Sequence, residues 1–588
     1  MGAPLRIANC SGFYGDRLSA AREMVDDGPI DVLTGDWLAE LTMLILARRR
    51  AKSPGRGYAP TFLTQMEQVM GTCLDRGIRV VTNAGGLDPD HCAQEVAALA
   101  DRLGLTPRVA YVSGDDLVSR LAELAAAGAP VRHAETGEPL RPDGILTANA
   151  YLGAFGIAEA LGRGADIVVT GRVTDAALTC GPAIWHHGWA RDDYDALAGA
   201  VVAGHVIECG AQATGGNYSF FTEVPGLEHA GFPWAEVAQD GSSVIGKHDG
   251  TGGEVSVGTV TAQLLYEIDA PRYLGPDVVA RFDTIELEAL GPNRVRISGV
   301  RGEPPPATLK VATNELGGYR QDIAIALTGL DIEAKATLLE SAFWHACPFT
   351  PREFDRVTTH LARTDKPDPA TNEEAVAVWH LTLRDRDERK VGRAVADASV
   401  ALALATIPGF FYLGTNPGPG EPFGIYRPGL VRADLVPQLV TVLGAETTTV
   451  PSAWDHAPAP VAEPADRVPA AELPSEPTRR VPLGRVVGAR SGDKGGTANL
   501  GVFARTAEAF AWLDGFLTTA RLRELLPEAG RLRIERHRLA NLDAINFVIH
   551  DLLEEGVAAS SRQDKQAKGL GEWLRSRVVD VPERLLAP

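Results

Sequence analysis

The feature that most constrains the fold is a repeated pattern in the first third of the chain. Short apolar runs each end in glycine plus a small polar residue, and helix-length segments such as 94–105 and 117–127 separate them. Strands that alternate with helices predict βαβ units and a mostly parallel sheet. The runs, each with its loop, are 5–8 with 9–12, 30–33 with 34–36, 79–82 with 83–86, 109–112 with 113–116, and 166–170 with 171–175.

The loops after these runs are the first place to look for a ligand site. In open parallel sheets, ligands bind outside the carboxyl ends of the strands, where all five loops would meet. The same residue types also make ordinary turns and cap helices, so a single loop of this kind would indicate little. Five of them at one edge of the sheet favour a site.

The rest of the chain divides by composition into further segments. A glycine-dense segment over 201–311 contains alternating runs at 254–260 and 293–300 that predict strands, and α/β character returns over 317–413 with a helix at 332–343. We therefore expect a large α/β domain over 1–450 and a Pro/Ala-rich linker over 451–481. Residues 482–588 predict a small α+β domain with a ferredoxin-like βαββαβ order.

Composition excludes several classes of protein. The 588 residues carry 57 Lys and Arg against 76 Asp and Glu, a net charge of −19, which argues against binding to a nucleic-acid backbone. The six cysteines show no CxxC spacing, which indicates reduced structural thiols. The chain shows no signal-like start, and its longest apolar run is too short to span a membrane. We expect a soluble cytoplasmic protein with no membrane or nucleic-acid partner.

The first strand-end loop contains Gly12, Gly15, Asp16 and Arg17. A glycine-rich turn that opens a helix can hold an anion with its N–H groups, although this loop has neither a GxGxxG nor a Walker pattern. The alternative is a tight turn in which Asp16 favours the helix N-terminus.

The next loops supply charged side chains. Asp36 and Glu40 are four residues apart and would share one helix face. Such a pair needs a shared proton, an arginine or a hard cation such as Mg²⁺, and metal-free acid/base work is favoured because no histidine ligand pair accompanies it. Arg172, three residues before Asp175, suits capture of a carboxylate or phosphate, unless the two only stabilise their loop.

Two later segments crowd polar side chains between glycines. The first includes Glu208 and Cys209, and the second includes His248, whose ordinary pKa lies nearest neutrality and which is therefore a candidate general acid or base. A turn histidine and a buried, inert Cys209 are the alternatives. The remaining candidate substrate-binding residues are Asn83, Gly215, Gly216, Asn217, Thr251 and Gly253 and, in the last domain, Arg490, Asp493, Lys494 and Asn499.

Several of these segments together resemble the acyclic terpene utilisation family. They are NCSGFYGDR, GDWLAELTM, VTNAGG, ADIVVTGRVTDAAL, ECGAQATGGNYS and KHDGTGGEVSVGTVTAQLLYEI. The segments ARSGDKGGTANLGVFAR and NFVIHDLLEEGVAASSRQDKQAKGLGEWL resemble the small ferredoxin-fold domain of that family. The resemblance implies a place in the catabolism of terpenoid or branched acids through acyl-CoA intermediates. In NCSGFYGD, residues 9–11 replace the glycines of the commoner family version, so the family name does not define the substrate.

These observations predict an enzyme that acts on an anionic small molecule, which includes CoA thioesters, by proton transfer next to a carbonyl, as a hydratase or lyase. Arg17 and Arg172 would hold the anion, Asp36, Glu40, His248 or Glu208 would move the proton, and N–H groups near Gly215 and Gly253 would stabilise an oxyanion. No fingerprint indicates a nicotinamide or flavin cofactor. A non-catalytic component of an acyl-CoA carboxylase-type assembly and a Mg²⁺-dependent phosphate-handling transferase are the alternatives. The two-domain organisation is compatible with a homo-oligomer.

Overall fold

The computed structural model describes residues 2–414, 417–453 and 476–586, which form two compact units. The first unit comprises Met1–Asn314, Tyr426–Val557 and Asp564–Pro588, and the second comprises Glu315–Ile425 and Ala558–Gln563. Most of the predicted linker falls on 454–475, outside the described residues. No helix in the described part of the chain combines the length and apolar character that a membrane span requires.

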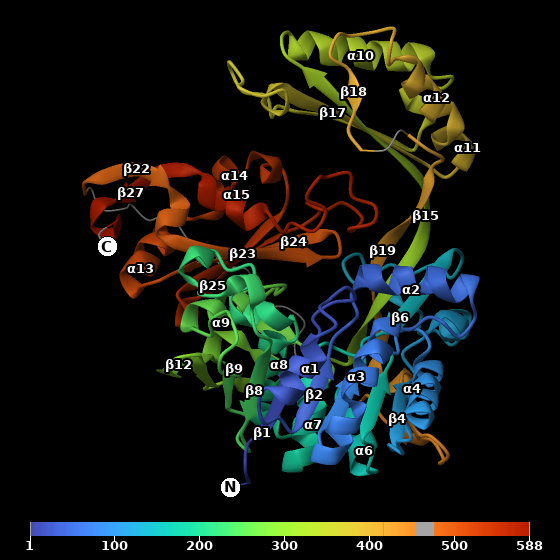
Figure 1. Ribbon diagram of the computed structural model, residues 1–588, viewed down its shortest axis with the longest axis vertical. Helices are drawn as coiled ribbons and strands as arrows, with labels where there is room; N and C mark the ends of the chain where they lie inside the picture. Colours follow the sequence, from blue (N-terminus) through green and yellow to red (C-terminus); the bar gives the residue numbers. More distant parts are fainter. Residues whose placement is uncertain (1, 415–416, 454–475, 587–588) are drawn as a thin grey trace. The chain divides into compact units, whose positions relative to one another are not determined.

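An eleven-stranded sheet forms the centre of the first unit in the described chain, in the order β12-β13-β9-β8-β1-β2-β3-β7-β4-β20-β21. The labelled strands follow this order across Figure 1, from β12 to β4. Its five central strands are parallel: β1 (Leu5–Asn9), β2 (Val32–Gly35), β3 (Arg79–Thr82), β7 (Ile167–Thr170) and β4 (Val109–Ser113). They coincide with the five predicted runs.

The prediction of a mostly parallel sheet is not confirmed, because antiparallel strands extend both edges and make the sheet mixed. On one edge these are β8 (Pro233–Val237), β9 (Ser243–Lys247), β13 (Arg294–Ser298) and β12 (Glu286–Gly291). On the other they are β20 (Gln438–Val442) and β21 (Thr448–Val450). Short turns join β8 to β9 and β12 to β13, and a tight turn can only return the chain antiparallel.

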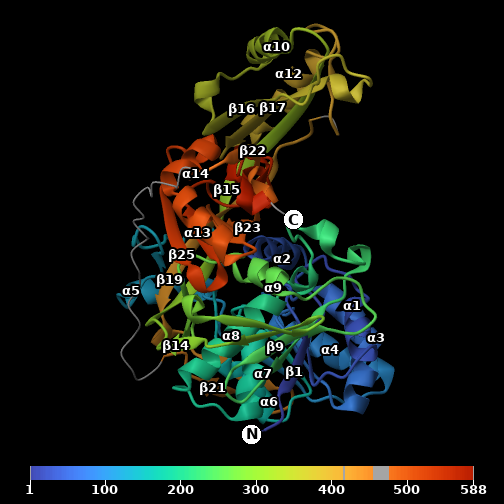
Figure 2. The ribbon, with the colours of Figure 1, turned by 90° about the vertical axis from the view of Figure 1, so that its left-hand side faces the viewer.

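Helices cover both faces of the parallel strands because apolar side chains alternate along each strand. Ala8, Leu33 and Val80 pack with α1 (Ala20–Asp26), α3 (Pro60–Arg76) and α4 (Pro89–Leu103). Ile7, Val32 and Val81 pack on the opposite face with α6 (Phe155–Gly162), α7 (Ala177–His187) and α8 (Tyr194–Ile207). Figure 2 shows these two groups of helices on the two sides of β1 and β9.

The C-terminal part of the first unit is a four-stranded antiparallel sheet, ordered β23-β24-β26-β25. It contains β23 (Val487–Lys494), β24 (Thr497–Ala504), β25 (Ile534–Leu539) and β26 (Ala544–Ile549), with α13 (Ala507–Phe516), α14 (Thr519–Leu525) and α15 (Leu570–Ser576). This order differs from the predicted βαββαβ order in two ways. Among the described residues, no helix lies between β23 and β24, which pair directly, and β27 (Val578–Pro582) lies outside this sheet and pairs with β22 (Thr478–Pro482).

Of three local predictions, two are confirmed and one is wrong. The helix predicted at 332–343 is α10 (Ile332–Ala346), and the strand predicted at 293–300 is β13. The strand predicted at 254–260 is wrong, because α9 (Val257–Leu264) begins there. Ser256 and Thr259 form a reciprocal capping box at its start, and this local pairing outweighs the two-residue alternation.

The second unit is an α/β unit with its own core. Strands β15 (Thr308–Thr328), β17 (Val376–Asp385) and β16 (Arg356–Ala362) pair antiparallel, and α10 and α12 (Arg393–Ala401) bury Ile325, Trp379 and Leu381 against them.

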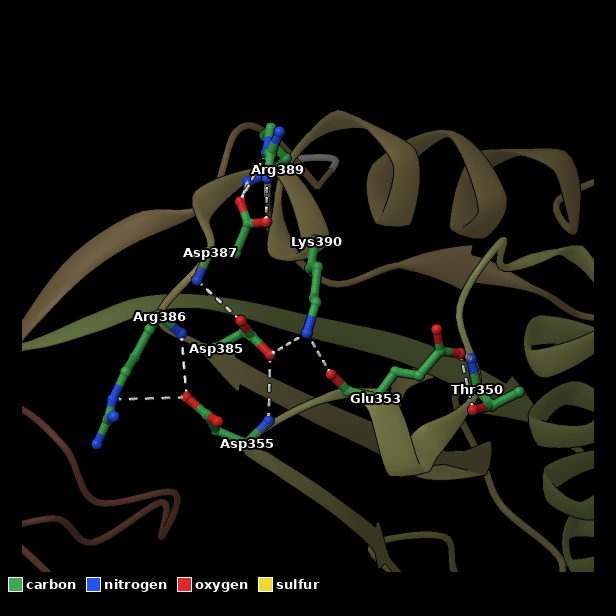
Figure 3. Close-up of polar contacts among 8 residues, drawn as sticks. All are labelled: Thr350, Glu353, Asp355, Asp385, Arg386, Asp387, Arg389 and Lys390. Carbon is green, nitrogen blue, oxygen red and sulfur yellow. Dashed lines mark hydrogen bonds and ion pairs between the residues drawn. The ribbon is translucent and has the colours of Figure 1, made fainter.

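A polar network closes the end of β17 (Figure 3). The buried Asp385 carboxylate accepts hydrogen bonds from the backbone N–H groups of Asp355 at 3.2 Å and Asp387 at 2.8 Å, and it lies 3.0 Å from Lys390 Nζ. Lys390 also donates to the Glu353 carbonyl oxygen at 2.5 Å. One carboxylate therefore ties β17 to the turns on both sides of it.

Because the buried Asp385 carboxylate accepts from two backbone N–H groups and pairs with Lys390, Asp385→Asn should lower the free energy of unfolding by about 1–3 kcal/mol. Asp387→Asn is the matched control: its side chain bonds the exposed Arg389, so its denaturation midpoint should barely change. Chemical denaturation followed by tryptophan fluorescence tests this, and equal midpoints for the two variants would contradict it.

Candidate functional site

The parallel strands bring Asp36, Asn83, Arg172 and Asp175 together at their carboxyl ends, as the loop pattern predicts. Asp36 is buried just after β2, and the Asn83 amide donates to its Oδ1 at 2.5 Å. The Asn83 oxygen in turn accepts from the Trp37 backbone N–H at 2.7 Å. Asn83 therefore fixes the orientation of Asp36.

Arg172 is the central cation of the site, and its side chain is only 3% exposed. Its Nη2 lies 3.1 Å from Asp175 Oδ1, its Nη1 donates to the Leu38 carbonyl oxygen at 3.1 Å, and its guanidinium lies 4.1 Å from the centre of the Tyr151 ring. Beneath it, the buried Asp115 carboxylate accepts from the Arg172 backbone N–H at 2.9 Å. A Cβ at Gly171 would lie 2.4 Å from Asp115 Oδ1, so this approach requires glycine.

Lys310, on β15, is a second cation in the site. Its Nζ lies 3.5 Å from Glu40 Oε1, at the start of α2 (Glu40–Lys52), and 4.8 Å from the Tyr151 ring centre. The Tyr151 hydroxyl donates to the same Glu40 oxygen at 3.2 Å. Burial by itself would raise the pKa of Glu40, but Lys310 and Arg172 outweigh it and lower that pKa to about 2. Glu40 is therefore a permanent counter-ion.

Three other carboxyl groups bind their protons more tightly than usual. Burial raises the pKa of Glu208 well above its ordinary value, and the charges of Asp175 and Glu267 add to this. Burial followed by the charge of Asp175 does the same for Asp36, and burial raises the pKa of Asp175 against the opposing pull of Arg172. The site thus holds carboxyl groups with raised pKa values beside fixed cations.

Glu208 has the least satisfied surroundings of these acids. It follows the end of α8 with its side chain 10% exposed, and its Oε2 has no hydrogen-bond partner. Its Oε1 lies 3.4 Å from Nδ1 of the fully buried His205, whose pKa burial lowers to about 4. The imidazole is therefore neutral at physiological pH. Glu208 Oε2 is a buried oxygen without a hydrogen-bond partner.

The groups of the site are enclosed by protein but reached by water. The side chains of Asp175, Lys310 and Glu40 are 30%, 35% and 26% exposed, although loss of hydration is the largest influence on the pKa of each. These side chains therefore combine partial exposure to water with strong desolvation by the surrounding protein.

The C-terminal sheet contributes further charges to the same site. Lys494 lies 2.8 Å from Asp269 Oδ2, and Lys568 lies 4.0 Å from Asp493 Oδ1. Burial raises the pKa of Asp493 to about 8, and the charges of Glu267 and Glu40 contribute to this. The predicted residues of the last domain therefore belong with those of the parallel strands.

Other predicted residues lie elsewhere or are occupied. His248 is buried with its Nε2 3.0 Å from the Met24 carbonyl oxygen, and burial lowers its pKa; its described partners lie outside the charged cluster. The structure therefore does not bring His248 together with Asp36 and Glu40. Thr251 bonds the His248 carbonyl, and Asn217 occupies a left-handed turn with φ +59°.

The predicted oxyanion donors are also used within the fold. The N–H groups of Gly215, Gly216 and Gly253 donate to the carbonyl oxygens of Gln212, Ala211 and Pro225 at 3.2, 2.9 and 2.8 Å. An oxyanion cannot displace them without unfolding these turns. The predicted oxyanion role therefore does not fit these glycines, and Arg172 and Lys310 are the donors that the site offers.

The first glycine loop holds one of its own carboxylates. Asp16 accepts from the N–H groups of Gly12 at 2.9 Å and Arg17 at 2.8 Å, and Arg17 pairs with Glu23 at 2.7 Å. A Cβ at Gly12 would lie 2.5 Å from the Cys209 backbone, and Gly15 packs against Phe13, so close packing accounts for both glycines. The predicted anion cradle is therefore already filled.

A metal site receives no support from side-chain grouping. No set of three or more His, Cys, Asp or Glu side chains in the described residues is arranged to hold a metal ion. Asp36 is held by Asn83, and Glu40 is paired with Lys310. The 491–496 segment belongs to the hairpin of β23 and β24, where Gly495 supplies the turn with φ +65°, and not to a phosphate-binding loop.

Sequence reasoning missed Tyr151, His205, Glu267, Lys310 and Lys568. None of them belongs to a pattern that indicates chemistry, because Lys310 lies within a strand and His205 within a helix. Lys568 falls in the segment that resembles the family's C-terminal domain, which is the only signal that could have found it.

The fold and the site define an α/β protein whose buried acids and cations meet at the carboxyl edge of a mixed sheet, beside a ferredoxin-like domain. The acyclic terpene utilisation family protein AtuA matches residues 5–442, and the AtuA ferredoxin-like domain matches residues 481–580. The chain therefore belongs to the acyclic terpene utilisation family. Comparison with curated proteins and with solved structures gives no match.

The raised pKa of Glu208 has a consequence for stability. The folded protein keeps this proton at pH values where the unfolded chain has released it, so Glu208 destabilises the fold progressively above about pH 4.3, the ordinary glutamate value. Glu208→Gln should therefore raise the melting temperature more at pH 8 than at pH 5. The exposed Glu228→Gln is the control, and a pH-independent difference for Glu208→Gln would contradict the assignment.

Proposed function

We propose that this protein is an enzyme of carboxylic-acid or acyl-CoA catabolism that moves a proton next to a carbonyl group, as a hydratase or lyase. The observation that carries the proposal is Glu208, whose pKa is raised well above its ordinary value and whose buried Oε2 has no protein partner, in the charged cluster that also contains Arg172 and Lys310. Strongly perturbed carboxyl groups next to specific charge partners are typical of catalytic sites. Family membership supports a substrate from terpenoid or branched-chain breakdown.

The two cations receive the anionic part of the substrate. Arg172 is held by Asp175, Leu38 and Tyr151, and Lys310 is held by Glu40, so both are oriented before a ligand arrives. Fixed cations in a partly desolvated place stabilise an oxyanion or enolate without having to reorganise. Glu40 keeps Lys310 in place and takes no proton, because its pKa is about 2.

For hydration of a double bond conjugated with the carbonyl, the steps balance as follows. Asp175 takes a proton from water as the water oxygen bonds the β-carbon, and the electron pair of the double bond moves to the carbonyl oxygen beside Arg172 and Lys310. Glu208 then gives its proton to the α-carbon. Return of the proton from Asp175 to Glu208 restores the starting state, with Asp36 as a further neutral acid.

Two alternatives belong to other classes. A non-catalytic component of an acyl-CoA carboxylase-type assembly would gain nothing from burying ionisable groups that lack partners, which costs stability. A Mg²⁺-dependent phosphate transferase would need Asp36 and Glu40 free for a cation, and both already have protein partners. A homo-oligomer stays a prediction.

Proton transfer next to a carbonyl is tested by hydrogen–deuterium exchange. The protein in D₂O is mixed with saturated and α,β-unsaturated branched and terpenoid acids and their CoA thioesters, and NMR follows deuterium at the α-carbon. Glu208→Gln and Arg172→Met should each slow exchange at least about 100-fold, the usual contribution of a positioned acid, and Glu228→Gln should not.

Exchange that is unchanged in both variants would contradict the proposal. A thermal shift that only nucleotide with Mg²⁺ produces would favour the transferase instead. A protein that neither exchanges nor binds any of these compounds, but is recovered with a carboxylase, would favour the assembly.

A further inference from the structure

Glu267 adopts a backbone conformation that its side chain does not favour. It follows the end of α9 with φ +56°, in the left-handed region. Helices often end with a residue in this conformation, and that residue is usually glycine because a Cβ is penalised there. If this residue only ended the helix, glycine would be less strained than glutamate at this position.

A second strained backbone position, Ala567, lies next to Lys568, the ion-pair partner of Glu267. Nine non-glycine residues of the described chain have positive φ, and all but Glu267, Glu554 and Ala567 are Asn or Asp, which tolerate it. Ala567, with φ +53°, directly precedes Lys568, whose Nζ lies 3.7 Å from Glu267 Oε1. Strained backbone thus occurs on both sides of one ion pair, and such strain clusters at functional sites.

Two amide side chains of the C-terminal sheet hold Glu267 in place. The Asn499 oxygen accepts from the Glu267 backbone N–H at 2.8 Å, and its amide nitrogen donates to the Asn546 oxygen at 2.5 Å. The Asn546 amide donates to the carbonyl oxygens of Ile268 and Asp269 at 3.1 and 2.6 Å. Both asparagines are almost completely buried, so these bonds are shielded from water.

Glycines let the C-terminal sheet approach the end of α9 this closely. A Cβ at Gly501 would lie 2.5 Å from Leu265 Cβ, and one at Gly492 would lie 2.5 Å from the Tyr266 ring. Lys568 and Arg490 lie 4.5 and 4.2 Å from the centre of that ring. The segment 265–269 is therefore enclosed by the C-terminal sheet.

The charge of Glu267 acts on the proton-handling groups of the large domain. It is among the influences that raise the pKa of Glu208 and of Asp175, and it raises the pKa of Asp493 next to burial. The other titratable groups that interact electrostatically with Glu208 include Asp175, Arg172, Lys494, Asp36, Cys209 and Tyr273, with His205 in contact.

We infer that the C-terminal domain forms part of the site. Its Asn499–Asn546 pair holds Glu267 in the left-handed conformation, and the Glu267–Lys568 ion pair then closes the site beside Glu208. Glu267 is a positioning residue that acts through Glu208, and the inference rests on the proposed function. It gives the ferredoxin-like domain, through Asn499, Asn546 and Lys568, an indirect part in proton transfer.

The test combines melting temperature with infrared spectroscopy of protonated carboxyl groups. The Glu208 band is identified by its loss in Glu208→Gln, and its pH dependence is followed in each variant. Glu267→Gly should raise the melting temperature by about 1–2 °C, because strain is relieved. The same variant should lower the pH at which the Glu208 band disappears, because a like charge is gone.

Asn546→Leu should lower the melting temperature and shift the Glu208 band in the same direction, because the segment 267–269 is released. Asn541→Leu is the matched control. Asn541 also joins the C-terminal domain to the large domain, by donating to the carbonyl oxygens of Phe282 and Ile285 at 2.8 and 2.9 Å. Its loss should lower the melting temperature without moving the band.

The remaining outcomes contradict either this inference alone or the proposed function as well. A Glu208 band that is present but unmoved by Glu267→Gly and Asn546→Leu overturns this inference and leaves the proposed function standing. A lower melting temperature in Glu267→Gly shows that Glu267 is kept for structure and also overturns it. Absence of a Glu208 band from the wild-type protein overturns the proposed function together with the inference.

Discussion

The buried guanidinium of Arg172 is the interaction on which the rest of the site depends. A charge removed from water must be compensated by protein groups, and Asp175, the Leu38 carbonyl and the Tyr151 ring supply that compensation. These partners belong to the loops after β2 and β7 and to the segment before α6, so the arginine joins them into one edge. Glu40 and Lys310 extend the same charge pattern, and Asp36 and Glu208, whose pKa values are raised, border it. Burial and the neighbouring charges, Arg172 among them, together set the proton affinities of the site.

The C-terminal domain acts on the same chemistry from the opposite side. Its sheet has one apolar face, with Leu500, Val502 and Phe547 packed under its helices, and one face that presents Arg490, Lys494, Asn499 and Asn546. A sheet with polar side chains on its second face must have a polar partner, and the end of α9 provides it through backbone groups. This arrangement explains why the Glu267 strain persists, since the buried amide pair stabilises the conformation that the residue alone would avoid.

How well sequence reasoning performed depended on the range of the interactions involved. The five parallel strands were predictable, because apolar runs that end in glycine and polar residues are a local signal. The capping of α9 by Ser256 and Thr259 is just as local, and the strand prediction there failed because alternation was given more weight than capping. Asp36, Arg172 and Asp175 were candidates because their loops share a sheet edge, and Glu208 because its segment places polar side chains between glycines. Gly12, Gly215 and Gly253 were candidates for the anion-binding N–H groups of glycine-rich turns, but the fold uses them for close packing and turns.

The sequence by itself determined the α/β character, the edge of the sheet at which charged loops meet, and the presence of a separate C-terminal domain, since all three depend on short-range patterns of apolar, glycine and polar residues. Only the tertiary structure decided which charges face one another. Lys310, Tyr151 and His205 lie far apart in the chain and look ordinary in their strand, loop and helix, yet they surround Glu40 and Glu208. The pKa of a carboxyl group depends on burial and on charges within a few ångströms. Glu40 and Glu208, alike in sequence, therefore became a fixed anion and an acid with a raised pKa only once the chain had folded around them.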